Sequence, residues 1–469
     1  MKDHQATPLS PPQRDGGARR AGAPHWTEHV IWWHVHPLGF TGAEPEAVSA
    51  PVRHRLDRII GWLDYAVELG ASGLLLGPIF ASETHGYDTV DHHRLDPRLG
   101  DAGDFARLVT AAHDRGMRVL LDGVFNHVGR GFPAFRRVLA QGLAAPEANW
   151  FHLSQPDGAG PGAEPGYETF EGHRRLVALN HSEPAVADHV TDVMCHWLDA
   201  GADGWRLDAA YAVPPAFWAE VLTRVRAEHP GAYFAGEVIH GDYAAIVRDS
   251  TMDTVTQYEL WKAIWSSLND RNLFELAWAL DRHNSFLASF APLTFAGNHD
   301  VTRLASALTD LRHLPHALAV LFTVGGTPVV YYGDEQAFRG VKEHRAGGDD
   351  AIRPPFPAGG PGELDPGGWP VYRLHQDLIG LRRRHPWLHR ARSRPLHLSG
   401  TRLALEVSDG RQRLVTVLNL DDAPFEQTVP GLTRVLAGEA VLRGATVTLP
   451  GHGWAVLGDH DPLERKGQS

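Results

Sequence analysis

The sequence predicts an α/β protein whose main part is a parallel (β/α)8 TIM barrel. From about residue 29 onward, eight short apolar runs alternate with amphipathic segments of helical period, the pattern of strands buried between helices. Several of these runs end in an acidic or amide side chain, as expected where the carboxyl ends of barrel strands meet on one face. After about residue 386 the pattern changes to short strand-like runs separated by Gly, Asp, Asn and Pro, which predicts a C-terminal antiparallel β-sandwich.

The apolar runs are the expected barrel strands, and the amphipathic segments between them are the expected outer helices. The strands are expected at residues 30–35, 73–80, 118–124, 204–208, 233–238, 254–258, 293–297 and 327–332. The clearest helical patterns lie at residues 53–69, 102–115, 184–200, 215–227 and 371–384. This alternation favours a closed parallel barrel over an open sheet.

Two connections are longer than an ordinary βα loop. Residues 129–182 are rich in Gly, Pro and aromatic residues, which predicts a small inserted domain after the third strand, and residues 333–369 follow the eighth strand. Long loops on this face of a barrel usually line the substrate cleft. We therefore expect the barrel at 29–128 and 183–386, the inserted domain at 129–182 and the β domain at 387–469. Residues 1–28 are expected to form a disordered tail.

Composition narrows the possible partners. The formal charge of −12 argues against nucleic acid and fits a neutral small molecule. The single cysteine, Cys195, excludes an intramolecular disulfide and is expected to be a buried structural thiol. The first 24 or so residues contain no apolar stretch of the kind a signal peptide needs, and no run approaches the roughly 20 apolar residues of a membrane span. We therefore expect a cytoplasmic protein without a membrane partner.

Four acidic segments follow predicted strands, at residues 122–127, 204–208, 236–237 and 297–300. Retaining hydrolysis of an acetal needs two carboxyl groups roughly 5–5.5 Å apart, one to attack and one to protonate the leaving oxygen. Arg206 lies two residues before Asp208, on the same face of the strand, and is expected to keep that carboxylate ionised. Glu237 ends an apolar strand, an environment that favours the protonated form that an acid catalyst needs. With Asp300, which would bind sugar hydroxyls, these residues indicate glycosidic-bond chemistry.

In this order, the four segments resemble the signatures of the α-amylase family of glycoside hydrolases, from about residue 29 to the C-terminus. The resemblance implies that Asp208 is the nucleophile, Glu237 the acid/base and Asp300 the transition-state stabiliser. It also implies a (β/α)8 barrel with a small domain inserted after strand three and a C-terminal β domain.

The same resemblance implies further substrate-binding residues. The segment His85-Gly-Tyr-Asp88 resembles the family segment after the second strand, where Tyr87 stacks on the sugar before the scissile bond and Asp88 bonds its hydroxyls. A segment at residues 349–356 resembles part of the family's eighth loop, from which Arg353 is expected to reach the cleft and pair with Asp88. The complete set of expected binding residues is His85, Tyr87, Asp88, His127, Arg206, His299 and Arg353.

The chain departs from the family pattern at a calcium site that many amylases share. The family ligands include Asn126, an acid where this chain has Ala178, and a histidine where it has Ala212. Calcium takes six to eight oxygen ligands, and an alanine side chain supplies none. We therefore expect no calcium site, no metal and no cofactor.

Residues 176–184 are closer to the neopullulanase, cyclomaltodextrinase and α-glucosidase branch of the family. Those enzymes usually carry an extra N-terminal β domain, whereas only about 28 residues precede the first strand here. That domain is expected to be missing, so a homodimer would have to form differently. The resemblance implies retaining hydrolysis of α-1,4 or α-1,6 glucosidic bonds in small linear or cyclic maltooligosaccharides.

The sequence leaves two alternative enzyme functions open. A transglycosylase or isomerase of the same family, of glucanotransferase or trehalose-synthase type, would keep the same three acids, and the sequence does not separate transfer from hydrolysis. His34-Val-His36, near the end of the first strand, resembles the zinc-binding pair of metal-dependent amidohydrolase barrels. Such a site also needs histidines at the ends of strands five and six, where this chain has Glu237 and the segment 257–259, Gln-Tyr-Glu. That alternative is therefore remote.

Overall fold

The computed structural model describes residues 23–47, 51–155, 164–345 and 347–459. Residues 1–22 of the expected disordered tail lie outside this range. The end of the expected tail is folded, because His25–Glu28 forms the 3-10 turn η1. Trp26 of this turn packs edge-on against Trp32 and Tyr233, with ring centroids 5.9 and 5.5 Å away.

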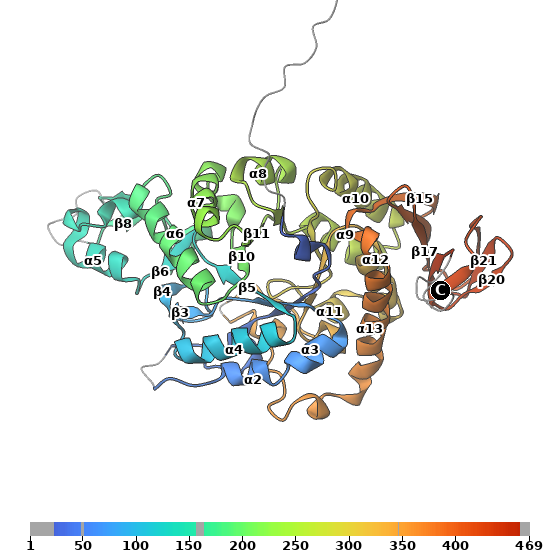
Figure 1. Cartoon of the computed structure of the whole chain (residues 1–469), viewed down its shortest axis with the longest axis horizontal. Coiled ribbons are helices and arrows are strands. Elements are labelled where there is room, and N and C mark those ends of the chain that lie inside the picture. The colour runs from blue at the N-terminus through green and yellow to red at the C-terminus, as the bar shows by residue number, and fades with distance from the viewer. Residues whose placement is uncertain (1–22, 48–50, 156–163, 346, 460–469) are drawn as a thin grey trace, which may run out of the picture.

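The centre of the molecule is the predicted eight-stranded parallel barrel (Figure 1). Its strands are β1 (Trp32–Val35), β2 (Gly73–Leu76), β5 (Arg118–Gly123), β10 (Gly204–Leu207), β11 (Tyr233–Gly236), β12 (Thr254–Val255), β13 (Leu293–Phe295) and β14 (Thr327–Tyr331). The sheet order is β12-β11-β10-β5-β2-β1-β14-β13. A parallel bridge between Thr256 and Leu293 joins the two edge strands and closes the barrel.

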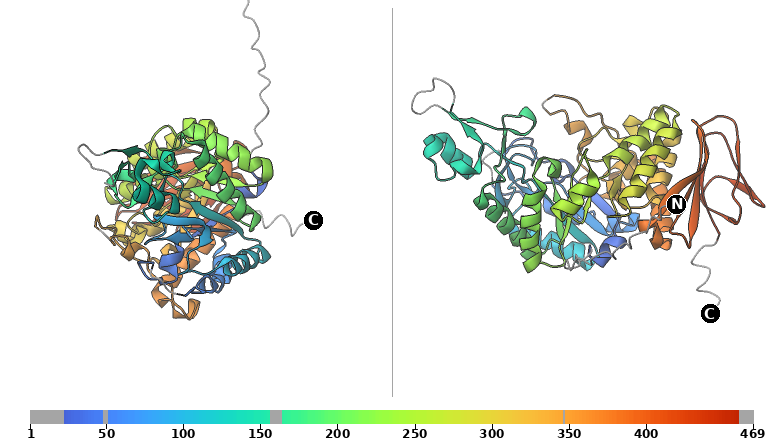
Figure 2. Two further views of the ribbon diagram at one scale, coloured as in Figure 1. Left: turned by 90° about the vertical axis from the view of Figure 1, so that its left-hand side faces the viewer. Right: turned by 90° about the horizontal axis from the view of Figure 1, so that it is seen from above.

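Helices lie between successive strands and surround the sheet (Figure 2). They are α1 (Pro37–Phe40), α2 (Leu56–Ile60), α3 (Leu63–Leu69), α4 (Ala102–Asp114), α6 (Pro184–Asp199), α7 (Pro215–Glu228), α8 (Tyr243–Ser250), α9 (Tyr258–Asn269), α10 (Leu273–Phe286), α11 (Leu304–Ala307), α12 (Leu314–Thr323) and α13 (Trp369–Arg384). The single helix predicted at 53–69 is two helices, separated at Gly61 and Trp62.

Most of the barrel strands are slightly shorter than expected, and two of them end well before their predicted limits. The second strand ends at Leu76, and Phe80 instead begins the antiparallel hairpin of β3 (Phe80–Ser82) and β4 (Thr89–Leu95). The sixth strand has only Thr254 and Val255, because the side chain of Gln257 accepts a hydrogen bond from Leu260 N and caps α9. Apolar runs alone do not show where such a strand ends, since the residues that follow are also buried.

The barrel interior is filled near the amino ends of the strands. Trp32 and Tyr233 are both buried and lie nearly parallel, with ring centroids 6.4 Å apart. They belong to an inner apolar cluster with residues of β2, β5, β11, β13 and β14 and two residues just outside the strands, namely Val30, Leu75, Leu120, Ala235, Tyr258, Leu293, Phe295 and Val329. Since this end is packed with apolar side chains, a polar site can form only at the opposite mouth.

The insertion after the third barrel strand contains β6 (His127–Gly129), α5 (Pro133–Gln141), β7 (Leu153–Ser154), β8 (Gly166–Tyr167), the turn η4 (Phe170–Gly172) and β9 (Leu176–Ala178). β6 pairs antiparallel with β9, so the chain leaves and re-enters the barrel side by side. Gly129 allows this strand to approach the β3–β4 hairpin, because a Cβ there would lie 2.4 Å from Asp88 O. The insertion therefore packs against the hairpin that carries Tyr87 and Asp88.

The C-terminal residues form two antiparallel sheets, as predicted. One has the order β15 (Arg392–Leu398), β16 (Arg402–Ser408), β17 (Arg413–Asn419), β22 (Trp454–Gly458), β19 (Arg434–Gly438); the other has the order β18 (Phe425–Thr428), β21 (Thr446–Leu449), β20 (Val441–Arg443). The insertion and these sheets lie at opposite ends of the molecule (Figures 1 and 2). Within the described residues, we find no helix both long and apolar enough to span a bilayer.

Candidate active site

Three barrel strands bring the predicted acids to the same mouth. Asp208 follows β10 and its N–H donates to Gly123 O at 3.0 Å, whereas Glu237 follows β11 and its N–H donates to Leu207 O at 2.8 Å. Asp300 lies on the loop after β13. Asp208 and Glu237 are 6% and 5% exposed, so both carboxyl groups are largely removed from bulk water.

Arg206 connects the carboxyl groups. Its Nη1 lies 2.6 and 2.7 Å from the oxygens of Asp122 and 3.3 Å from Oδ1 of Asp208, and its Nη2 lies 2.8 Å from Oε1 of Glu237. Arg206 and Asp122 stand at the same level on the neighbouring strands β10 and β5. One buried guanidinium therefore serves three buried carboxyl groups.

The expectation that Arg206 keeps Asp208 ionised is wrong for this ligand-free arrangement. Burial raises the pKa of Asp208 well above its usual range, the charge of Glu237 raises it further, and the opposing effect of Arg206 does not compensate. The physical reason is that the strongest contacts of Arg206 are with Asp122 and Glu237. Since a single positive charge cannot balance three carboxylates, the cluster binds a proton readily.

Glu237 is held by three donors. Its Oε1 accepts from Arg206 and, at 2.9 Å, from the Tyr258 hydroxyl, while its Oε2 accepts from Ala209 N at 3.0 Å. Ala209 has a φ of 45°, a left-handed conformation that costs free energy in a residue with a Cβ. This turn directs the N–H next to Asp208 at Glu237, so the two carboxyl groups are neighbours. Asn298 Nδ2 donates to the Tyr258 oxygen at 2.9 Å and fixes its orientation.

Asp300 forms a separate ion-pair network with His299 and Arg353. Its Oδ2 is 2.9 Å from His299 Nε2, and its Oδ1 is 2.9 Å from Arg353 Nη2. Burial opposes ionisation of Asp300, but His299 and Arg353 together outweigh it and lower the pKa of this carboxyl well below its usual range. The pKa of Asp300 is therefore shifted in the direction opposite to that of Asp208.

Arg353 reaches the site as expected, but its predicted partner is wrong. It pairs with Asp300 and with Asp349, also at 2.9 Å, and its Nε donates to His299 O at 3.0 Å. The oxygens of Asp88 accept instead from Thr84 N and Oγ1, at 2.9 and 2.5 Å. Asp88 therefore stabilises the turn of its own hairpin. Arg353 pairs instead with Asp300 in the loop after the seventh barrel strand and with Asp349 in the loop after the eighth.

Tyr87 lies between the two ion-pair networks. Its hydroxyl contacts His299 Nε2 and donates to Asp122 Oδ2 at 3.1 Å, and its ring stacks on His299 at a centroid distance of 5.4 Å. His127 Nε2 bonds Tyr87 O at 3.1 Å, and His85 is exposed with its ring 5.9 Å from that of Tyr87. All seven predicted binding residues thus lie at the barrel mouth or on its hairpin; their contacts with a sugar remain predictions.

His34 and His36 pack against the same centre. The ring of His34 is 5.0 Å from that of His299, and His36 Nδ1 accepts from Gly39 N at 3.1 Å. Burial lowers the pKa of both histidines well below the usual range, so both are neutral at pH 7. β11 and β12 present Glu237 and Gln257 rather than histidines, so the described residues do not assemble an amidohydrolase zinc site.

The prediction that the calcium site is missing concerns the junction of the insertion and the barrel. Asn126 is turned to His127, with 3.1 Å between Nδ2 and Nδ1. Ala178 pairs with His127 in the β6–β9 ladder, and Ala212 ends the short turn after β10. Neither alanine has a side-chain oxygen that could bind a hard cation such as calcium. We therefore continue to predict that the protein does not depend on calcium.

Several residues of the site were not predicted. Asp122, Tyr258, Asn298 and Asp349 contact the predicted residues directly, and Tyr211 donates to Glu171 Oε1 of the insertion at 3.1 Å. Asp122 begins the acidic segment at residues 122–127 that the sequence indicates, but its pairing with Arg206 follows from the register of two neighbouring strands. The others lie on helix ends or loops whose positions depend on the closed barrel.

Comparisons with a family model, with related sequences and with solved structures all lead to the same protein family. Residues 54–391 match the family model described as alpha amylase, catalytic domain. A cyclomaltodextrinase of Geobacillus thermopakistaniensis (strain MAS1) is 30% identical over 471 residues, covering 92% of this chain and 77% of that protein. Neopullulanase 2 of Thermoactinomyces vulgaris is 31% identical over 398 residues, covering 80% of this chain and 66% of that protein. The ligand-free cyclic α-maltosyl-(1→6)-maltose hydrolase of Arthrobacter globiformis has a TM-score of 0.79 and 27% identity, covering 93% of this chain and 100% of that structure.

Proposed function

Because this chain belongs to the α-amylase family, as a glycoside hydrolase of the cyclomaltodextrinase and neopullulanase kind, we propose that it is a retaining hydrolase of α-glucosidic bonds. Its substrates are small linear or cyclic maltooligosaccharides joined by α-1,4 or α-1,6 bonds. The substrate class is supported by the names of its relatives, which include cyclomaltodextrinase and neopullulanase. The formal charge of −12 agrees with a neutral ligand.

The single observation that carries this proposal is the contact of Arg206 with both Asp208 and Glu237, at 3.3 and 2.8 Å. Two carboxyl groups on adjacent strands that share one guanidinium support the short separation that a double displacement requires. An inverting mechanism needs a wider separation, with room for a water between sugar and base. The Ala209 N–H, which bonds Glu237, further limits the separation.

In the proposed reaction Asp208 attacks the anomeric carbon and forms a covalent glycosyl ester, while Glu237 gives its proton to the leaving oxygen. Glu237 then removes a proton from water, which attacks the ester and releases a product with the original α configuration. Asp300, kept ionised by His299 and Arg353, accepts hydrogen bonds from the hydroxyls of the sugar. These bonds strengthen as the ring flattens, which favours the transition state.

The proton must be on Glu237 and not on Asp208 when the bond breaks. Asp208 and Glu237 contact the same guanidinium, so a small shift of Arg206 toward Asp208 would favour ionisation of the nucleophile. The Tyr258 hydroxyl receives a hydrogen bond from Asn298 and lies 2.9 Å from Glu237. The hydroxyl can rotate to accept a hydrogen bond from protonated Glu237 instead of donating one to the carboxylate. In the proposed reaction, substrate binding leaves Asp208 ionised and Glu237 able to donate its proton.

Product analysis tests the proposal. The purified full chain is incubated with maltotriose, isomaltose, pullulan and cyclodextrins, and the first products are followed by proton NMR. We expect maltooligosaccharides or cyclodextrins to be cleaved, with water as the acceptor and the α anomer appearing first. An initial β anomer would contradict retention. Longer oligosaccharides or trehalose as the main products would replace hydrolysis by transfer or isomerisation.

A further inference from the structure

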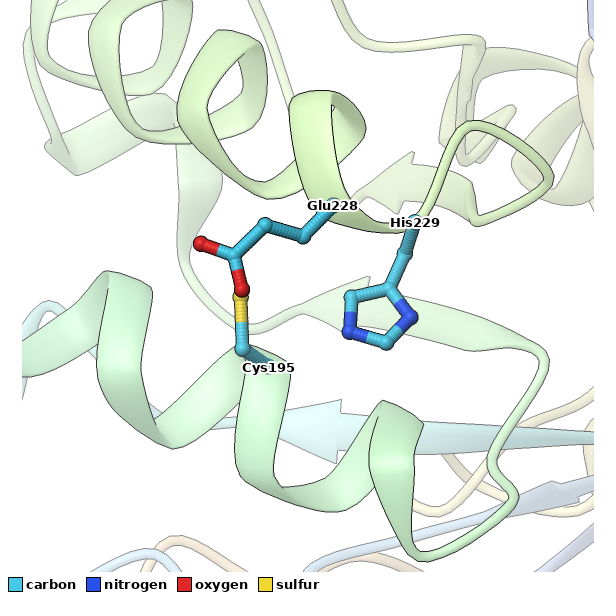
Figure 3. A group of neighbouring side chains, drawn as sticks. All are labelled: Cys195, Glu228 and His229. Carbon is cyan, nitrogen blue, oxygen red and sulfur yellow. The ribbon is translucent and has the colours of Figure 1, made fainter.

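A second group of reactive side chains lies on the outer helices, at the face opposite the barrel mouth. Cys195 is near the end of α6, and Glu228 and His229 stand at the end of α7. The Cys195 sulfur, a Glu228 oxygen and a His229 ring nitrogen all lie within 4.8 Å of one another. Figure 3 shows the carboxylate of Glu228 directed at the thiol and the imidazole of His229 turned toward both. Two helices thus bring a sulfur, an oxygen and a nitrogen donor together.

The charges around this group favour a cation. The thiol is 9% exposed, and the charged groups acting on it are three carboxylates and one guanidinium, namely Glu228, Asp199, Asp192 and Arg224. The guanidinium is bound elsewhere, because Arg224 Nη2 lies 2.7 Å from an oxygen of Asp188. Asp192 contacts His93 at 2.9 Å and Asp199 contacts His229 at 3.4 Å, whereas Glu228 forms no ion pair with any other described residue, so its carboxylate is available to a cation beside Cys195.

The helix termini add to this field. α6 ends at Asp199 and α7 at Glu228, and the two helices pack against each other. The carboxyl end of a helix carries a partial negative charge, which stabilises cations within the last turn. Both ends meet at this group, so backbone and side chains attract the same kind of ion.

We propose that Cys195, Glu228 and His229 form a binding site for a transition-metal ion of the zinc type. Zinc takes thiolate, imidazole and carboxylate ligands in a tetrahedron with metal–ligand distances of about 2.0–2.3 Å. Donors within 4.8 Å of one another reach this geometry through small rotations of the two side chains at the surface. On binding, the Cys195 thiol gives its proton to solvent and its sulfur bonds the metal.

The fourth position is taken by water or by Asp199. Oδ1 of Asp199 lies 3.4 Å from His229 Nε2, and this carboxylate side chain is 74% exposed, so it is free to turn toward the ion. The metal would join α6 and α7, the helices that precede and follow β10. The site is separate from the proposed catalytic machinery, so it stabilises the barrel without taking part in turnover. This inference does not depend on the proposed function.

Cobalt is the probe that tests the site, because a thiolate bound to Co²⁺ absorbs in the near ultraviolet and the chain has a single cysteine. The reduced, metal-free full chain is titrated with Co²⁺, and Zn²⁺ is then added. We expect a charge-transfer band that saturates at one equivalent and is abolished by Zn²⁺. A second donor group at Asp310, His313 and His452 contains no sulfur, so binding there would give no such band.

Variants separate a built site from a reactive thiol alone. Cys195→Ser should lose the band, and His229→Gln and Glu228→Gln should each weaken cobalt binding by roughly tenfold or more. His196→Gln, which removes an exposed histidine next to Cys195, is the matched control and should bind like wild type. Zinc should raise the melting temperature of wild type and His196→Gln but not of Cys195→Ser. Absence of the band, or a band unchanged in both His229→Gln and Glu228→Gln, would overturn the proposal.

Discussion

One guanidinium and the three carboxyl groups around it decide the protonation of the site. Arg206 is 3% exposed and contacts Asp122, Asp208 and Glu237. Burial alone would lower the pKa of Arg206, but Asp122 and Glu237 raise it well above its usual range, so it remains charged. Asp122 thus holds the Arg206 guanidinium in place. The remaining hydrogen-bonding capacity of this guanidinium is divided between Asp208 and Glu237.

Replacing the proposed nucleophile tests the assignment of Asp208. Asp208→Asn should keep the fold, because the neutral amide is close in shape to the protonated carboxyl that this buried site favours. Turnover of maltotriose should fall by several orders of magnitude, since an amide cannot form the glycosyl ester. Asp249→Asn, at an exposed carboxylate on α8, is the control and should retain full activity. Activity above roughly a tenth of wild type in Asp208→Asn would remove Asp208 as nucleophile.

The sequence was sufficient to predict the residues at the ends of strands, because strand order places them on one face. Asp208, Glu237 and Asp300 were predicted in this way, and so were Arg206 and His299. The partner of Arg353 was not, since it depends on the path of a long loop after β14 that has no periodic pattern. The balance of charge was also missed: the contacts between Arg206 and Asp122 follow from which strands are neighbours, not from position in the chain.

Among the structural elements, the turn after β14 is held by a buried acid. Glu335 accepts from the Tyr65 hydroxyl at 3.0 Å and from Gly333 N at 2.9 Å, and it is fully buried. Burial raises the pKa of Glu335 to about 7, from an ordinary value of 4.5. Between these two pH values the folded chain binds a proton that the unfolded chain has released, so the stability from this group falls as pH rises from 4.5 to about 7 and changes little above that.

Glu335→Gln should therefore flatten the loss of stability with rising pH. The amide cannot ionise, so relative to wild type the variant should gain roughly 1–3 kcal/mol between pH 5 and pH 8. Urea unfolding at a series of pH values measures this difference. Glu363→Gln, at an exposed residue of the same long connection, should change neither curve. A wild-type profile parallel to that of Glu335→Gln would show that Glu335 is ionised throughout.

The junction between the insertion and the barrel leads to the calcium prediction. Ala178 and Ala212 occupy two family ligand positions. Calcium added to the metal-free protein should therefore leave the activity unchanged and shift the melting temperature by no more than about a degree, because an ion that is not bound cannot stabilise the folded state. Thermal unfolding with calcium and with a calcium-selective chelator makes the comparison. A clear rise of the melting temperature with calcium would reveal ligands outside these positions.

Across the whole molecule, the barrel and the C-terminal sheets share a core. Helix α12 packs between them, and one apolar cluster contains both Leu318 of α12 and Leu418 of β17. Polar contacts cross the same boundary, since Thr323 Oγ1 is 2.9 Å from Thr416 Oγ1 and His316 Nε2 is 3.1 Å from Gly453 O. An interface that is continuous with the core couples the two parts more strongly than a linker does.

We therefore expect the chain to unfold in a single calorimetric transition. Leu318→Ala, which removes a side chain that is 2% exposed, should lower the temperature of that transition by several degrees without splitting it. Val441→Ala, at an exposed residue on β20, should leave it unchanged. Two resolved transitions, with the lower one alone sensitive to substitutions in the C-terminal sheets, would show that the parts fold independently.

The alternation of apolar runs with segments of helical period was enough to predict this architecture. It did not show where individual strands end and turns begin. The sequence correctly indicated eight barrel strands and antiparallel sheets at the end of the chain. The sequence predicts that the second strand extends to Phe80, because Phe80 is apolar like the residues before it, whereas this residue begins the hairpin β3–β4. Such a turn is fixed by contacts with distant segments, as when Gly129 approaches Asp88, and these appear only once the barrel has closed.

The reaction of Glu237→Gln with a glucosyl fluoride and azide tests the central claim most directly, because it examines both proposed carboxyl groups in one experiment. The fluoride leaves without a proton, so Asp208 should still form the glycosyl ester, and hydrolysis of that ester should be slow without the base. Azide needs no deprotonation and should restore turnover. The account predicts an α-glucosyl azide, identified by NMR, whereas a β-configured azide would contradict double displacement through Asp208.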